Sequence, residues 1–262
     1  MIQDIVAALG IELMKIRRSM IFRVTIAASV FVSLMLALIM LLTKNPEVLP
    51  PGILKTKVAI AAISADWPSY IGFMEIASGA LGIVLYGFVA GWVFGREYDD
   101  KTIKDIVALP ISRSAIAFSK MLAIFLWSVL LALIMFVAGL AMGAAIDLPH
   151  WSAELIPNFA RVFFLTALLS ILLCPVTALV ASAGRGTLPA IGFVILCMGL
   201  ANLFGNIGLG AIFPWTIPML YTGAIGETGN FLPWYSYLIV FLTCAAGIGG
   251  TVLFWKFADQ YR

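Results

Sequence analysis

The residues that could do chemistry are concentrated in one stretch, Phe94 to Lys120, with the sequence FGREYDDKTIKDIVALPISRSAIAFSK. It holds nine charged side chains in 27 residues, whereas only 11% of the whole chain is charged. Thr102 and Asp105 have the spacing of a capping box, so a short helix can begin there, and Pro110 would end it. Three apolar residues would form one face of this helix: Ile103, Ile106 and Val107. Such a helix is typical of a docking surface, whereas a solvated connector explains the charge but not the apolar face.

Catalytic signatures are missing from the sequence. There is no G-x-x-x-x-G-K-[ST] loop to cradle a nucleotide phosphate and no H-E-x-x-H helix to bind zinc. A single histidine, His150, excludes a histidine-cluster metal site. The three cysteines lie in apolar runs without a C-x-x-C pair, as expected of small hydrophobic residues. The sequence therefore predicts a chain that is not an enzyme and holds no cofactor or metal of its own.

The composition excludes a soluble domain, a disordered chain and a nucleic-acid binder. Of the 262 residues 63% are hydrophobic, the formal net charge is only +3, and the mean hydropathy is +1.08. A soluble domain is about half apolar and about a quarter charged. Six spans of about 20 residues would use roughly half of the chain, which leaves no room for a separate soluble domain of typical size. We therefore expect a single all-α transmembrane domain.

Runs of apolar residues predict six spans, at residues 21–42, 70–94, 119–145, 158–182, 188–212 and 234–256. Residues 1–20 predict an amphipathic helix in the membrane interface; a plain cytoplasmic tail is the alternative. Its apolar stripe has seven members: Ile2, Ile5, Val6, Leu9, Leu13, Ile16 and Met20. The polar side has six: Gln3, Asp4, Glu12, Lys15, Arg17 and Arg18. Pro175 should kink the fourth span.

The distribution of lysine and arginine predicts the orientation. With the N-terminus inside, the inner segments hold twelve of these residues and the outer segments hold four. Positive residues are concentrated on the cytoplasmic side of membrane proteins. We therefore expect a multi-pass protein of the cell membrane with both termini in the cytoplasm.

Weaker candidates lie within the spans. Gly87, Gly91 and Gly95 form a flat strip that allows close helix approach, either at a dimer seam or in internal packing. Glu75 is the one acid well inside a predicted span, and it could line a transport path or reach the outer interface. Asn202 and Asn206 could line such a path, but packing against a neighbouring helix is favoured.

The charged stretch resembles the permeases of type-2 ABC exporters, in particular the bacitracin-exporter-like branch. The matching residues between spans two and three are Gly95, Arg96, Glu97, Tyr98, Thr102, Ile103, Lys104, Asp105, Ile106, Val107, Leu109, Pro110, Ser112, Arg113 and Lys120. Two further matches are the N-terminal Glu12, Lys15, Arg17, Arg18 and Ser19, and the segment 213–218 (FPWTIP). The sequence departs from the family pattern at Lys101, where many members have glycine.

The resemblance implies a cytoplasmic coupling helix at about 102–109 between spans two and three, which contacts a separate ATPase. The residues carried over for this contact are Arg96, Glu97, Thr102, Ile103, Lys104, Ile106, Val107, Pro110 and Arg113. ATP and Mg would be bound by the ATPase subunit, and a second permease, identical or different, would complete the complex. The cargo implied is amphipathic: a peptide antibiotic, a peptide toxin or a lipid-like drug. The alternative is a stand-alone secondary transporter or channel. Ion coupling in such a protein would need charged residues within the membrane, and Glu75 is the one candidate.

Overall fold

The computed structural model describes residues 2–45, 64–107, 111–225 and 232–257, and within these ranges the chain is helical without any strand. It has six segments long and apolar enough to cross a membrane: α2 (Met20–Lys44), α4 (Trp67–Asp99), α6 (Arg113–Ala145), α7 with α8 (Leu155–Ala183), α9 (Thr187–Asn206) and α11 (Trp234–Phe257). The three shorter helices are α1 (Ile2–Arg18), α5 (Ile103–Val107) and α10 (Ile217–Tyr221). The six predicted spans are therefore confirmed.

Capping residues, rather than hydropathy, determine where several helices begin. The side chains of Ser19, Asp66 and Ser112 accept hydrogen bonds from backbone N–H groups three residues on, at the starts of α2, α4 and α6. As a result α6 begins at Arg113, six residues before the predicted start of span three. Span five is shorter than predicted. Helix α9 ends at Asn206 and not at residue 212, because the chain turns at Gly208, which has a φ of +80°.

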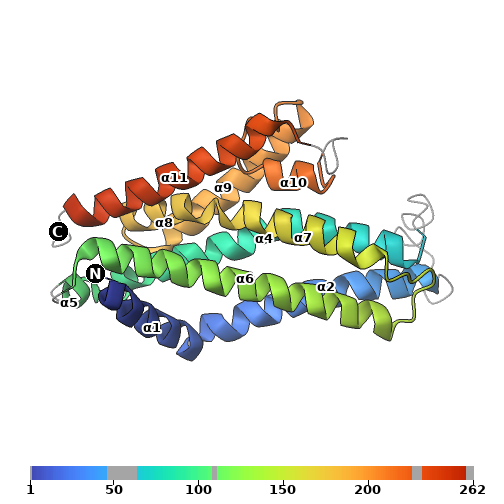
Figure 1. Ribbon diagram of the computed structural model, residues 1–262, viewed down its shortest axis with the longest axis horizontal. Helices are drawn as coiled ribbons and strands as arrows, with labels where there is room; N and C mark the ends of the chain where they lie inside the picture. The colour runs from blue at the N-terminus through green and yellow to red at the C-terminus, as the bar shows by residue number, and fades with distance from the viewer. Residues whose placement is uncertain (1, 46–63, 108–110, 226–231, 258–262) are drawn as a thin grey trace.

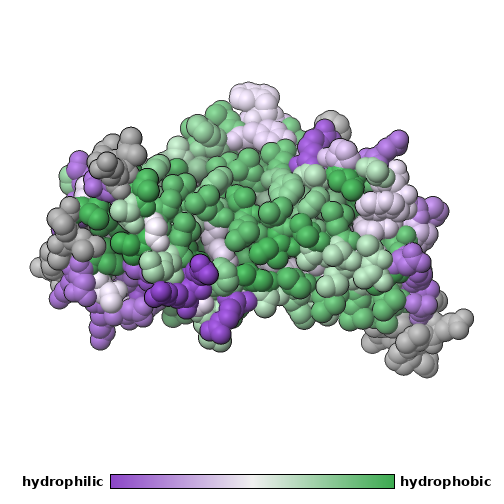
Figure 2. Space-filling view, turned by 60° about the horizontal axis from the view of Figure 1, so that its bottom comes forward, coloured by the Kyte–Doolittle hydropathy of each residue, from purple (hydrophilic) through white to green (hydrophobic). Residues whose placement is uncertain are grey.

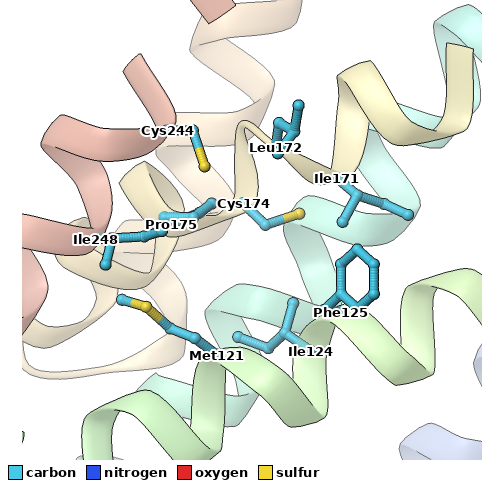
Figure 3. A pocket seen from close by; sticks show the side chains of 9 residues that line it. All are labelled: Met121, Ile124, Phe125, Ile171, Leu172, Cys174, Pro175, Cys244 and Ile248. Atoms are coloured by element: carbon cyan, nitrogen blue, oxygen red, sulfur yellow. The ribbon is translucent and has the colours of Figure 1, made fainter. Parts of the chain in front are cut away.

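The fourth span is broken into α7 (Leu155–Ile171) and α8 (Cys174–Ala183). Pro175 has no N–H, so it cannot make the backbone bond to the residue four positions earlier, and the helix is interrupted. At the break, the Leu173 N–H donates to the Ser170 carbonyl, three residues earlier, at 3.2 Å. A cavity of about 140 Å³ lies beside the break, lined by residues of α6, α7, α8 and α11 that include Cys174, Pro175 and Cys244 (Figure 3). The kink predicted at Pro175 is thus present as a break between two helices.

Helix α4 is the centre of the bundle and packs against α2, α6, α7, α8 and α9 (Figure 1). The end of α4, the helix α5 and the last turns of α11 lie at the same end of the bundle as the start of α1. An apolar belt covers the middle of the surface and hydrophilic residues gather mainly towards the two ends (Figure 2). This distribution matches a bundle that spans a bilayer.

Helix α1 packs part of its apolar stripe against the protein. Ile16 is 2% exposed, and Leu9 and Leu13 also pack against the main hydrophobic core, because α1 lies along α6. Val6 and Met14 are at least half exposed, at 63% and 50%, on the other side of the helix. The helix therefore has apolar side chains on two faces, one against the protein and one outward. Its position in a membrane interface stays a prediction.

Candidate functional site

The glutamate at the end of α4 is the centre of a buried group of charges. Glu97 is 1% exposed. Its Oε1 accepts hydrogen bonds from Lys120 Nζ at 2.8 Å and Lys15 Nζ at 3.1 Å. Its Oε2 accepts from Thr102 Oγ1 at 3.3 Å and lies 3.5 Å from Arg96 Nε. Glu97 was predicted to contact an ATPase, and the structure instead places it inside the chain, where a partner cannot reach it.

A buried lysine joins this glutamate to α1. Lys120 lies two turns inside α6 and is 0% exposed. Besides Glu97, its ammonium group donates to Glu12 Oε2 at 3.2 Å and to the Val93 carbonyl at 3.0 Å. Lys15 also bonds Glu12, at 2.9 Å. The ion cluster therefore connects α1, α4 and α6, and its five members are Glu12, Lys15, Arg96, Glu97 and Lys120.

Burial makes the ion cluster sensitive to the loss of any member. Charges removed from water are stable only when they are paired and hydrogen-bonded. The two carboxylates each meet at least two cations, and Lys120 has three acceptors at 2.8–3.2 Å, which is its full donor capacity. The cluster therefore holds three helices in one relative position, and a shift of one helix costs charge pairing in all three.

The turn after α4 is left-handed at Lys101, the position where the sequence departs from the family pattern. Lys101 has a φ of +58°, in the left-handed region that favours glycine. The Thr102 N–H donates to the Glu97 carbonyl at 2.9 Å, and the Lys101 N–H donates to the Tyr98 carbonyl at 3.1 Å. This is a Schellman motif with Lys101 at its left-handed position. The turn therefore has the backbone that a glycine would adopt, with a lysine in its place.

A short helix, α5, lies where the sequence predicts one, but its apolar side turns inward. Ile103 is 6% exposed and belongs to the main core, and Ile106 is partly buried against the same core. Ile103 cannot therefore be an apolar contact for a partner, and this part of the prediction was wrong. Lys104 and Asp105 are the exposed side chains of α5. Pro110, with residues 108–109, lies outside the described residues, as does the side chain of Val107.

Arg96 and Arg113 differ in their surroundings. The Arg96 guanidinium lies 4.8 Å from the centre of the Trp92 ring, and its side chain is 17% exposed. Arg113 is half-buried at the first position of α6 and forms no ion pair with another described residue. Ser112, directly before it, caps the helix, since its Oγ accepts from the Ala115 N–H at 3.2 Å.

Comparison with known proteins shows the family of the chain. A family model described as "ABC-2 family transporter protein" matches residues 8–202, which include the whole ion cluster and α5. The chain belongs to the ABC-2 transporter family. It is also 28% identical over 181 residues to the bacitracin transport permease protein BCRB of Bacillus licheniformis, which covers 68% of this chain and 86% of that protein. The chain is thus a membrane subunit of an ABC transporter, as the resemblance predicted.

The glycine strip is used in internal packing. A side chain at Gly87 would meet Val194, one at Gly91 would meet Ala190, and one at Gly95 would meet the Gly186–Thr187 backbone, all in or just before α9. The strip therefore allows α4 and α9 of the same chain to approach closely, which agrees with internal packing, one of the two alternatives left open by the sequence.

In the described part of the chain, the side chains of the transport-path candidates form no hydrogen bond with one another. The Glu75 side chain is half-buried on α4, and its carboxylate forms no hydrogen bond or ion pair with another described residue. Asn202 and Asn206 are exposed on α9, where each donates to a carbonyl of its own helix, Met198 at 3.0 Å and Asn202 at 2.7 Å respectively. The two asparagines therefore do not hold a neighbouring helix of this chain.

Sequence reasoning did not assign a role to Glu12 and Lys120, although both carried a signal. Glu12 was placed on the polar side of α1, and Lys120 was noted only as the last residue of the family pattern. A lysine within an apolar run needs a buried partner, and Glu97 is one of four acids between Phe94 and Lys120, with Asp99, Asp100 and Asp105. What the pattern did not show is that Glu12, 108 residues earlier, is the second partner.

Proposed function

We propose that this chain is the permease of an ATP-driven exporter that moves an amphipathic cargo out of the cell. The cargo class is a peptide antibiotic, a peptide toxin or a lipid-like drug. Membership of the ABC-2 family and the similarity to a bacitracin transport permease support this proposal. ATP and Mg would be bound by a separate ATPase subunit, and a second permease, identical or different, would complete the transporter.

The observation that carries the coupling mechanism is the position of α5 against the ion cluster. In this proposal the ATPase contacts the exposed side of α5, at Lys104 and Asp105. Ile103 fixes α5 to the core, and Thr102 bonds Glu97 at 3.3 Å, so a push on α5 acts on α1, α4 and α6 together. Nucleotide in the ATPase would then bias a two-state equilibrium of the helices.

The orientation follows from the same proposal. The end of the bundle that carries α5 faces the cytoplasm, where the ATPase has access to it, which agrees with the twelve-to-four bias of lysine and arginine. The start of α1 and the end of α11 are then also cytoplasmic. A transport path that includes Glu75, Asn202 and Asn206 stays a prediction.

Charge reversal on α5 tests the coupling mechanism. Lys104→Glu changes an exposed side chain, so it should leave folding intact but weaken contact with the ATPase. The measurements are pull-down of the co-expressed ATPase and bacitracin resistance of cells that carry both subunits. Arg23→Glu is the matched control, since Arg23 is an exposed cation at the start of α2. If Lys104→Glu retains the ATPase and full resistance, α5 is not the docking surface.

A further inference from the structure

A groove of about 260 Å³ lies between α2 and α4 near the middle of α4, with Met135 of α6 also in its lining. Six of its apolar lining residues are Val24, Ala28 and Val32 on α2 and Leu81, Leu85 and Phe88 on α4. Val24 and Leu81 are 45% and 42% exposed, so the groove opens on the surface of the bundle. From Val24 to Val32 it extends about 12 Å along the helix axis. Because both walls are membrane spans, the opening faces lipid.

The chemistry of the groove favours a hydrocarbon chain. The two hydroxyl groups in its lining, on Thr25 and Ser29, donate to carbonyls of their own helix, Ile21 at 2.8 Å and Thr25 at 3.0 Å. A peptide backbone seated there would leave its N–H and C=O groups without partners, which is costly away from water. A saturated or unsaturated acyl chain carries no such groups. The groove is therefore complementary to an acyl chain and not to a peptide.

The α4 wall of the groove leads to a positive charge. Trp92 and Arg96 follow Phe88 by one and two turns, on nearly the same face of α4. Because helical side chains lean towards the N-terminus, Arg96 reaches back towards the groove, and its guanidinium lies 4.8 Å from the centre of the Trp92 ring. With Arg96 included, the ion cluster has three cations and two carboxylates, a formal charge of +1. An anion at this rim would meet an excess of positive charge.

We infer that this groove binds an anionic phospholipid of the leaflet on the α5 side, with an acyl chain between α2 and α4 and its phosphate at Arg96. A tryptophan–arginine pair at the end of an apolar surface suits the depth at which headgroups lie. The site does not depend on the proposed cargo, because it requires only that the bundle lie in a bilayer. It links the lipid to coupling, since Arg96 shares Glu97 with Lys15 and Lys120.

Native mass spectrometry of the full-length chain from nanodiscs tests the site. The nanodiscs contain equal amounts of phosphatidylglycerol and phosphatidylcholine of the same chain length. One basic residue near a headgroup contributes about 1 kcal/mol, so the parent should retain phosphatidylglycerol about fivefold over phosphatidylcholine. Arg96→Gln should bring that ratio close to one. Ala28→Trp should reduce retention of both lipids by filling the groove, without touching the ion cluster.

Arg23→Gln is the matched control, because Arg23 is exposed on α2 on the side away from the groove lining. It should retain the parental ratio. The inference is overturned if the parent retains the two lipids equally, or if Arg23→Gln lowers the ratio as much as Arg96→Gln does. It is also overturned if a phosphatidylglycerol with a photoreactive acyl chain labels peptides other than those of α2, α4 and the segment of α6 around Met135, which also lines the groove. It is overturned as well if added bacitracin displaces that label and a photoreactive bacitracin labels the groove in its place.

Discussion

Removal of the Lys120 ammonium group should destabilise the protein strongly. Lys120→Met keeps the apolar stem but removes two ion pairs, to Glu97 at 2.8 Å and Glu12 at 3.2 Å, and the bond to the Val93 carbonyl. Breaking a buried pair from one side costs about 3–5 kcal/mol. Because each carboxylate still meets Lys15, we expect the lower value, about 3 kcal/mol, in the free energy of unfolding. For a chain of this size that lowers Tm by roughly 6–12 °C.

A double-mutant cycle separates lost pairing from lost packing. Glu97→Gln alone should also lower Tm, but in the Lys120→Met background it removes a carboxylate that has lost its best partner. The double variant should therefore be less destabilised than the sum of the single variants, by more than about 1 kcal/mol. The assay is thermal unfolding of the purified chain in detergent, with Arg23→Met as an exposed control that should keep the parental Tm. Additive effects of the two substitutions would refute the ion cluster as a coupled unit.

Three further predictions follow from the backbone, the packing and the topology. Lys101→Gly should raise Tm by a few degrees, because glycine adopts the φ of +58° without the penalty of a side chain, on the order of 1 kcal/mol; an unchanged or lower Tm would contradict the left-handed turn. Gly95→Leu should prevent folding or sharply reduce expression, since its side chain would overlap the Thr187 backbone. Gly192→Leu should express normally, because a Cβ at that position has no atom within 4 Å. Equal expression of the two variants would argue against the α4–α9 contact. A cysteine at Ser64 should react with an impermeant maleimide on intact cells and one at Lys101 only after lysis, against a low background because the native cysteines are buried; the opposite labelling would reverse the proposed orientation.

The fold could be predicted because the bilayer imposes a length and a polarity on each span. Hydropathy gives both directly, so six spans followed from the sequence, and Pro175 marked the break in the fourth. The exact ends of the helices could not be predicted from hydropathy. Ser112 caps the start of α6 and Gly208 turns the chain after α9, and both are local backbone effects. A hydropathy profile does not contain this information.

The site could be predicted only in part, because a periodic pattern does not say which surface an apolar face will meet. Ile103 has the spacing of a docking residue, and the same spacing serves a contact with the chain's own core. The glycine strip had the same ambiguity, since close approach is equally useful within a chain and between chains. Pairing of Glu12 with Lys120 depends on the tertiary placement of α1 along α6, and no local rule connects two residues 108 positions apart.

That separation has a consequence for how the protein is made. Glu12 emerges from the ribosome long before Lys120, so α1 cannot be locked in place until the third span has been synthesised. Until then Glu12 lacks its buried partner Lys120 and has Lys15 of its own helix as a cation, so its carboxylate is expected to stay in water or at the membrane surface, because burial of an incompletely paired charge is costly. Helix α1 is therefore translated before α6 but can be seated only after α6 has been made. Docking of α1 would serve as a checkpoint that the first three spans have inserted in the correct order.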